Sequence, residues 1–221
     1  MKEYQYILFD LDGTLTDPEQ GITTCVAYAL KHFGIETENK QELRKFIGPP
    51  LLESFMKFYK MTEDDAKIAV EKYRERFSVK GLYENKVFDG IKEMLECLKN
   101  QGKILIVATA KPTVYSKQIL EYFDLSKYFS FLAGSELDGR RTNKGEVIAY
   151  ALEHCKITDK KRVLMVGDRE HDIIGAKENK IDVMGVLYGF GNREEFEINK
   201  ADYVVETVQE LKEILTKEMG K

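Results

Sequence analysis

The sequence predicts an α/β fold in which a parallel sheet is interrupted by an all-helical insert. Short apolar runs recur along the chain, and each is followed by a helical pattern. This alternation is typical of parallel strands that are covered by helices on both faces. The first two runs are separated by about 90 residues, far more than the usual short connection and one crossover helix. No strand pattern occurs within residues 18–84, so the insert should be helical.

The expected strands are the five apolar runs of the chain. They are residues 6–10 (YILFD), 104–110 (ILIVATA), 129–134 (FSFLAG), 162–168 (RVLMVGD) and 183–189 (VMGVLYG). The helices between them are indicated by apolar residues at i, i+3, i+4 and i+7, as in residues 91–98. Pro112 marks a helix start, and Thr207 with Glu210 has the spacing of a capping box.

The insert divides the chain into two expected domains. Residues 1–15 and 85–221 should form the α/β core, and residues 16–84 should form a helical cap domain. Within the insert, Ile22, Val26 and Leu30 lie on one helical stripe. Residues 62–77 begin with a threonine cap and acids in the first turn.

Composition excludes several classes of protein. The 34 Lys+Arg and 38 Asp+Glu residues give a formal charge of -4 with mixed signs, which disfavours a nucleic-acid binder. The three cysteines are far apart and form no CxxC pair, so neither a disulfide framework nor a zinc site is expected. The sequence has no long apolar run and no leader pattern, so we expect a cytoplasmic protein that binds neither membrane nor nucleic-acid polymer.

Chemically reactive side chains follow the expected strands where each one ends. Asp10 and Asp12 follow the first strand, Thr109 and Lys111 end the second, and Lys144 comes after the third; Asp168 and Asp172 follow the fourth. Ligands of open parallel sheets bind at this edge. Carboxylates crowded together repel one another unless a cation compensates, and oxygen ligands without His or Cys select Mg²⁺. A lone Asp would be read as a turn residue, but this set predicts a magnesium site.

The spacing of Asp10 and Asp12 suggests a division of labour. Alternate residues at a strand end project to one side, and Gly13 allows a tight turn after them. One carboxylate can attack phosphorus to form an aspartyl-phosphate, while the other protonates the leaving alcohol and then activates water. Thr109 and Lys144 would supply a hydrogen bond and a charge to the phosphoryl oxygens.

These motifs resemble those of the haloacid dehalogenase (HAD) superfamily, in its phosphatase branch with a helical cap. The matching segments are DLDGT (10–14), VATAK (107–111), Lys144 and GDREHD (167–172), in the order of the four family motifs. The resemblance implies a Rossmann-like core and a phosphomonoester hydrolase with Mg²⁺ as cofactor. A dehalogenase would not need the second aspartate, so Asp12 favours phosphate esters.

The resemblance also implies a role for each matching residue. Asp10 would be the nucleophile, and Asp12 the general acid/base and, through its backbone carbonyl, a metal ligand. Asp168 would bind the metal and Asp172 would support it, directly or from one layer further out. Thr109, Ala110 and Lys144 would hold the phosphoryl group. Arg169 departs from the small residue common at its position, which leaves the surroundings of the metal open.

Substrate choice should come from the cap. The segment RKFIGPPL (44–51) could present Arg44 and the backbone of Gly48 to an anion, although a rigid corner between helices would explain it equally well. Together with TAKP and GDREHDIIGAKEN, it resembles the phosphoglycolate phosphatase group and related 5′-nucleotidases. We expect a phosphoglycolate phosphatase acting on a small phosphorylated metabolite as a monomer or homodimer. A 5′-nucleotidase and a sugar phosphomutase are the alternatives.

Three further features stay open. Lys111 could contact an anion or simply start a helix, and His171 is interpreted as structural or exposed. The YGFG turn (188–191) could border the site or only reverse the chain. A phospho-receiver would have no use for a helical lid, and a scaffold protein would not need the acids. The chain has no GxxxxGK[ST] loop for an ATP-dependent kinase.

Overall fold

The computed structural model describes residues 2–217, which form two compact units. One unit comprises residues up to Thr16 and from Val87 onward, and the other comprises Asp17–Lys86. The chain passes between them at two short paired strands, β2 (Thr16–Asp17) and β3 (Lys86–Val87). No helix in residues 2–217 is both long and apolar enough to cross a membrane.

The α/β unit is built on a six-stranded sheet in the order β5-β4-β1-β6-β7-β8. Its strands are β1 (Tyr6–Phe9), β4 (Ile104–Pro112), β5 (Phe131–Ser135), β6 (Val163–Gly167), β7 (Asp182–Val186) and β8 (Tyr203–Val205). Every neighbouring pair is parallel. The predicted α/β class is therefore confirmed, and each of the five predicted apolar runs overlaps a strand. The central strand β1 pairs with β4 on one side and β6 on the other, so the residues after β1 lie in the middle of the sheet edge.

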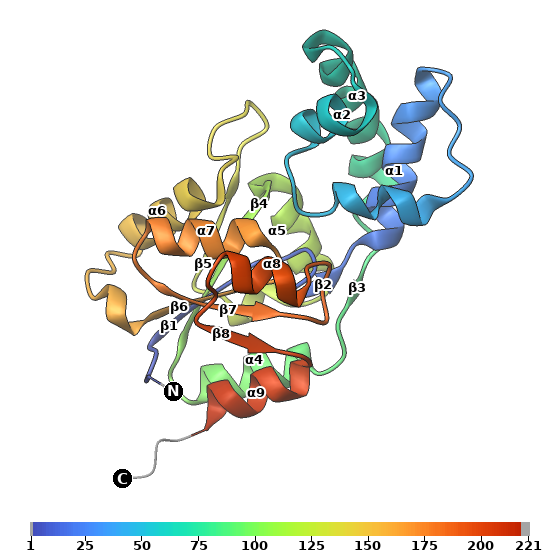
Figure 1. Ribbon diagram of the computed structural model, residues 1–221. Helices are drawn as coiled ribbons and strands as arrows, with labels where there is room; N and C mark the ends of the chain where they lie inside the picture. The colour runs from blue at the N-terminus through green and yellow to red at the C-terminus, as the bar shows by residue number, and fades with distance from the viewer. Residues whose placement is uncertain (1, 218–221) are drawn as a thin grey trace. The chain divides into compact units, whose positions relative to one another are not determined.

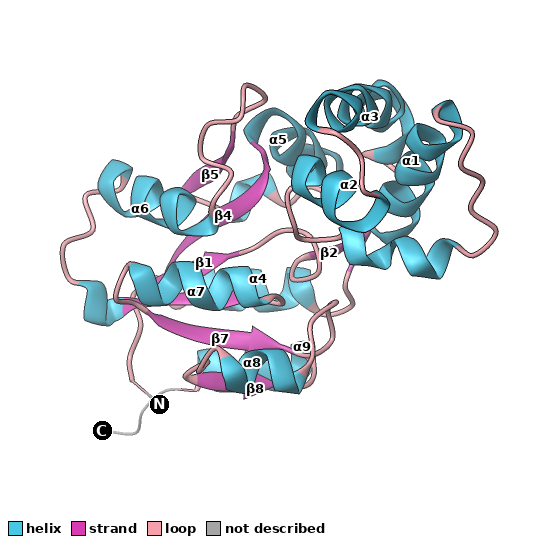
Figure 2. Cartoon of the chain, turned by 45° about the horizontal axis from the view of Figure 1, so that its top comes forward, coloured by secondary structure: helices cyan, strands magenta, loops and turns pink. Residues whose placement is uncertain are grey.

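Helices cover this sheet (Figures 1 and 2). They are α4 (Ile91–Asn100), α5 (Thr113–Tyr122), α6 (Lys144–His154), α7 (Glu170–Glu178), α8 (Arg193–Ile198) and α9 (Val208–Thr216), with short 3₁₀ turns η3 (Ser126–Tyr128) and η4 (Lys160–Arg162). Helices α6 and α7 pack together over the sheet, and α4 lies beside α9 (Figure 1). Alternate strand residues such as Leu8, Ile106 and Met165 share one buried cluster with α6, α7 and Phe196 of α8, as the period of two in a strand requires.

The helical unit is formed by α1 (Glu19–His32), η1 (Lys40–Phe46), α2 (Leu51–Tyr59), α3 (Glu63–Arg76) and the π-helical turn η2 (Phe77–Gly81). Thr62 caps α3 by accepting a hydrogen bond from the N–H of Asp65, as its sequence predicts. Helix α1 approaches η2 closely because Gly21 has no side chain; a Cβ there would lie 2.2 Å from the carbonyl oxygen of Gly81.

Two local details differ from the sequence prediction. The edge strand β8 was not expected, because only three residues pair and they follow a polar segment. At α9, Thr207 accepts from the N–H of Glu210 as a capping box requires, but the Glu210 carboxylate accepts from Glu206 rather than from Thr207. The return hydrogen bond of the capping box therefore comes from the residue before the N-cap, Glu206, and not from the N-cap Thr207 itself.

Candidate active site

Three buried carboxylates meet at the carboxyl edge of the sheet. Asp10 follows β1 and Asp168 follows β6, while Asp172 lies in the first turn of α7. Their side chains offer oxygen atoms that all lie within 4.8 Å of one another. The residues are 7%, 0% and 1% exposed, respectively, so water screens their mutual repulsion little. The sequence separates Asp10 from Asp168 by more than the whole helical insert, and the parallel register of β1 with β6 brings them together.

Lys144 forms ion pairs with two of these acids. Its Nζ lies 2.9 Å from Oδ1 of Asp10 and 2.7 Å from Oδ1 of Asp172, and it also donates to the carbonyl of Ala108 at 3.1 Å. Asn143 caps α6 by accepting from the N–H of Gly145, which places Lys144 at the helix start. Burial alone would lower the pKa of Lys144, but the charges of Asp10 and Asp172 outweigh it and raise the pKa. The lysine therefore stays charged.

Asp168 and Asp172 both have raised pKa values. Burial, together with the charges of Asp172 and Asp10, raises the pKa of Asp168 well above its usual value. Burial raises the pKa of Asp172 to about 6 even though Lys144 opposes the shift. Both shifts mean that the cluster lacks positive charge at neutral pH.

A divalent cation fits this shortage. In the described part of the chain, four carboxylates, those of the three clustered acids and of Asp12, are paired with two ammonium groups, those of Lys144 and Lys111. Two negative charges are left over, which one dication would neutralise. The ligand atoms are oxygens only, the set that Mg²⁺ prefers. Asp10, Asp168 and Asp172 are the residues that could hold it.

The pKa shifts predict how stability depends on pH when metal is absent. An unfolded carboxyl titrates at about 4, so between about pH 4 and 6 folded Asp172 keeps a proton that the unfolded chain has lost. Its contribution to stability is present below about pH 4 and is lost as the pH rises to about 6, and Asp168 extends the loss upward. We expect Mg²⁺ to raise the melting temperature more at about pH 7.5 than at about pH 5. Thermal unfolding in EDTA and in Mg²⁺ measures this; an equal rise at both pH values would contradict it.

Asp12 is not one of the three clustered acids, and it pairs with Lys111. Lys111 Nζ donates to Oδ2 of Asp12, and the two side chains are only 7% and 12% exposed. Oδ1 of Asp12 is buried and has no hydrogen-bond partner among residues 2–217. Burial raises the pKa of Asp12, and the charge of Lys111 opposes the rise. The structure therefore gives Asp10 and Asp12 different cationic partners, although they are two residues apart.

The predicted phosphate-binding residues of β4 are also at this edge. Thr109 is 2% exposed, and its Oγ1 accepts from the N–H of Lys111 at 3.3 Å. Ala110 accepts from the hydroxyl of Ser135 through its carbonyl at 2.7 Å. Their contact with a phosphoryl group stays a prediction.

The YGFG turn holds Asp168, a role that the sequence left open. The N–H of Phe190 donates to Oδ2 of Asp168 at 2.8 Å, and the hydroxyl of Tyr188 donates to the carbonyl of Thr14 at 3.0 Å. Gly189 packs against the same side chain, where a Cβ would lie 2.4 Å from the Cβ of Asp168. From Gly13 (φ +81°), a Cβ would lie 2.1 Å from an Asp168 oxygen. The side chain of Asp168 therefore fits only because neither Gly13 nor Gly189 has a side chain.

We expect Gly189→Ala to damage this cradle. Its Cβ would lie 2.3 Å from the Gly13 carbonyl, and relieving such a clash costs about 1–3 kcal/mol of unfolding free energy and displaces Asp168. Gly102→Ala is the control, because a Cβ there meets nothing within 4 Å and only the positive φ is strained. Urea unfolding and calorimetric Mg²⁺ titration measure both effects. Unchanged Mg²⁺ affinity in Gly189→Ala would contradict the role of the turn.

Arg169 connects the loop after β6 to α8. Its backbone N–H donates to Oδ2 of Asp172 at 3.1 Å, and its Nε pairs with Glu195 at 3.1 Å. The N–H of Glu170 also donates to Glu195. The sequence did not single out Glu195, and its distance along the chain from Arg169 offered no signal. His171 is half-buried, and burial lowers its pKa, so the ring is neutral at neutral pH.

Arg44 and Gly48 belong to the helical unit. Arg44 lies in the last turn of η1 and forms a 3.2 Å ion pair with Glu19. Gly48 has a positive φ of 103° and precedes the two prolines before α2. Their contact with substrate stays a prediction.

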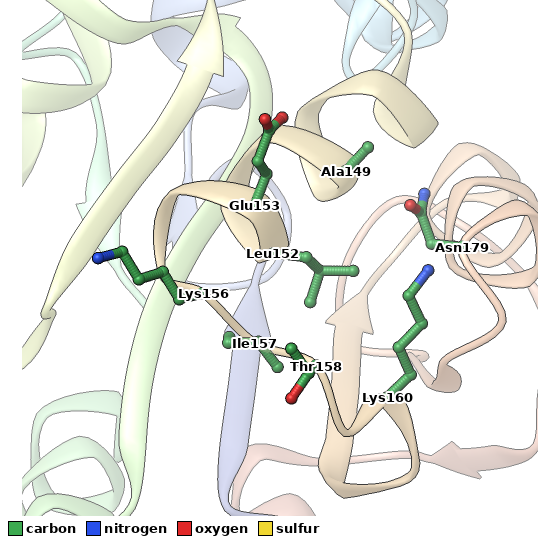
Figure 3. A pocket seen from close by; sticks show the side chains of 8 residues that line it. All are labelled: Ala149, Leu152, Glu153, Lys156, Ile157, Thr158, Lys160 and Asn179. Atoms are coloured by element: carbon green, nitrogen blue, oxygen red, sulfur yellow. The ribbon is translucent and has the colours of Figure 1, made fainter.

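A separate hollow of about 360 Å³ lies beside the second half of α6 (Figure 3). It is lined by Ala149, Leu152, Glu153, Lys156, Ile157, Thr158, Lys160 and Asn179. None of the acids or cationic partners described above lines it, so the hollow is no part of the carboxylate site.

The family comparison agrees with this geometry. Residues 7–186 match the model of the haloacid dehalogenase-like hydrolase family, and the chain belongs to this family. The fold and the related proteins define it as a phosphatase of the family, a phosphoric monoester hydrolase.

Particular relatives cover nearly the whole chain. A 5′-nucleotidase of Pseudomonas aeruginosa is 46% identical over 96% of both chains. The tyrosine-protein kinase PtkA of Mycobacterium tuberculosis is 35% identical over 96% of this chain and 72% of its own. A phosphoglycolate phosphatase of Vibrio parahaemolyticus is 25% identical over 97% of both. Among solved structures, a predicted phosphatase from Clostridium acetobutylicum is 49% identical with a TM-score of 0.94, covering 97% of this chain and 99% of its own.

Proposed function

We propose that this phosphatase is Mg²⁺-dependent and acts through an aspartyl-phosphate on Asp10. The observation that supports this most is the buried trio of Asp10, Asp168 and Asp172 with Lys144 against Asp10. Oδ1 of Asp10 accepts from the N–H of Leu11 at 2.7 Å and faces Lys144, which fixes the orientation of the carboxylate. A fixed nucleophile beside positive charge suits attack on an anionic phosphate.

The proposed reaction has two steps. A carboxylate oxygen of Asp10 attacks phosphorus, the ester P–O bond breaks, and Asp12 gives its proton to the leaving alcohol oxygen. Water then attacks the phosphorus of the aspartyl-phosphate, Asp12 takes the proton, and inorganic phosphate and free Asp10 are released. Lys144, Thr109 and the backbone of Ala110 would hold the phosphoryl oxygens. The bound Mg²⁺ would supply the positive charge that offsets repulsion between the nucleophile and the phosphate.

For the substrate, we propose nucleoside 5′-monophosphates first and phosphoglycolate second. This reverses the order expected from the sequence, because the relative named 5′-nucleotidase is 46% identical and the one named phosphoglycolate phosphatase only 25%. The segment around Arg44 and Gly48 is the proposed source of selectivity. A sugar phosphomutase would differ only in returning the phosphoryl group to a sugar hydroxyl.

Phosphate release over a substrate panel tests this proposal. The panel contains nucleoside 5′-monophosphates, phosphoglycolate, sugar phosphates and pyrophosphate, each with Mg²⁺, with EDTA, and with Mg²⁺ added back. We expect the highest kcat/KM for a nucleoside monophosphate and a loss in EDTA that Mg²⁺ reverses. Preference for phosphoglycolate would overturn the substrate order. A lack of phosphate release from every member, or full activity in EDTA, would overturn the proposed chemistry.

A further inference from the structure

Lys111 pairs with Asp12 at the edge of the sheet that carries the clustered acids. It lies near the carboxyl end of β4, where the pairing with β5 shifts register between Ala108 and Pro112. The shift marks a local irregularity in the strand just before α5 begins. Lys111 lies 99 positions from Asp12 along the chain, and its Nζ reaches Oδ2 of that residue across the neighbouring strand β1.

Asp10 and Asp12 pair with different lysines. Lys144 contacts Asp10 and Asp172, and Lys111 contacts Asp12. Burying a lysine side chain to 7% exposure costs desolvation and conformational entropy, so a surface helix start does not explain it. A buried ammonium group needs a fixed partner, and Oδ2 of Asp12 is such a partner for Lys111.

The two oxygens of Asp12 consequently differ. Oδ2 is held by Lys111, whereas Oδ1 is buried with no hydrogen-bond partner in residues 2–217. A buried carboxylate oxygen without a partner is costly and marks a place where a further group is expected. Rotation of the carboxylate would exchange the oxygens, and the bond to Lys111 opposes that rotation.

We propose that Lys111 is a positioning residue that holds Asp12 by Oδ2 and so presents Oδ1 to the leaving-group oxygen of the substrate. This inference rests on the proposed function, in which Asp12 is the proton donor. Lys111 thereby acts on the reaction through Asp12, not by binding the phosphoryl group. The competing role, a direct phosphate contact, would make Lys111 equally important for every phosphate ester.

Leaving-group chemistry separates these two roles. An alkyl alcohol needs a proton in order to leave, whereas p-nitrophenol leaves as a stable anion. General acid catalysis is typically worth about 10²–10⁴-fold where it is needed. If Lys111 only positions the acid, its loss should slow alkyl esters much more than the aryl ester. The parameter to compare is kcat/KM, because it reports the steps up to the first irreversible one and excludes the later attack of water on the aspartyl-phosphate.

The experiment compares Lys111→Met with the unaltered protein on a nucleoside monophosphate and on p-nitrophenyl phosphate, both with Mg²⁺. We expect kcat/KM to fall at least about 10-fold more for the alkyl ester than for the aryl ester. Lys111→Arg, which can still donate to Asp12, should recover part of the alkyl-ester rate. Lys117→Met is the matched control, because the Lys117 side chain is 70% exposed, and it should change neither rate. Equal losses on both esters would overturn the inference in favour of direct phosphate binding.

A double-mutant cycle keeps the test decisive if Lys111→Met loses stability. In Asp12→Asn the acid is already absent, so adding Lys111→Met should cost the alkyl ester little more if Lys111 acts through Asp12. Additive losses would contradict the inference. The proposed function is tested separately by the unaltered protein: if it hydrolyses neither ester, the function itself fails, whereas hydrolysis of both with equal or additive losses rejects only the role of Lys111.

Discussion

Asp10→Asn is expected to abolish turnover while the protein stays folded. An amide is a poor nucleophile toward phosphorus, so no covalent intermediate should form. Loss of a nucleophile in enzymes with covalent intermediates costs up to about 10⁶-fold in kcat, and we expect a fall of at least about 10⁴-fold here. The substitution keeps the shape of a side chain that is only 7% exposed, so packing should survive. Phosphate release and circular dichroism measure the two effects.

The matched control is Asp124→Asn. Asp124 has a positive φ of 58°, which Asn also tolerates, and its exposed carboxylate pairs only with Lys127 among the ion pairs described. Its activity should equal that of the unaltered protein. Activity of Asp10→Asn within about 10-fold of that control would mean that another group takes the phosphoryl group, because a tenfold change is only about 1.4 kcal/mol in barrier height.

Lys144→Met should cost both stability and activity. The substitution leaves Asp10 and Asp172 buried without their shared cation, and breaking a buried ion pair from one side costs about 3–5 kcal/mol of unfolding free energy. Activity should fall at least about 10²-fold if Lys144, as we propose, supplies a charge that stabilises the transferring phosphoryl group. Urea unfolding at about pH 7 in EDTA measures the stability loss.

The loss in Lys144→Met should shrink as the pH falls. Without the lysine, the carboxyl groups bind protons in the folded state at pH values where the unfolded chain does not, so protonation favours the folded state. The difference from the unaltered protein should therefore be smaller at about pH 5 than at pH 7. Lys117→Met, at an exposed position of α5, is the control and should be as stable as the unaltered protein at both pH values. A stability loss that does not depend on pH would mean that lost packing, not charge, explains the effect.

The sequence was informative wherever a residue's role follows from its place at a strand end. Asp10, Asp168 and Lys144 could be assigned to one edge because parallel strands end together, and the structure places them there. The apolar runs located five of the strands, because parallel strands that are covered on both faces are apolar along their length. The edge strand β8 gave too short a signal, since three residues cannot show a period.

Contacts between distant segments could not be predicted. The pairing of Lys111 with Asp12 depends on which strand lies beside β1 and on the shifted register at the end of β4. No local sequence pattern predicts either of these. The ion pair of Arg169 with Glu195 and the hydrogen bond from Phe190 to Asp168 likewise require the segment after β7 to approach the residues that follow β6. Local spacing predicts secondary structure and strand ends, whereas such partners are decided by tertiary packing.

The most direct test of the whole account is to trap the phosphoryl group on the protein. The enzyme with Mg²⁺ is mixed with excess substrate, quenched in acid within one turnover, digested with an acid protease and examined by mass spectrometry. We expect one added phosphoryl group on the peptide that contains Asp10, and none on that peptide in Asp10→Asn. A phosphoryl group on a different residue, with Asp10 unmodified during active turnover, would contradict it.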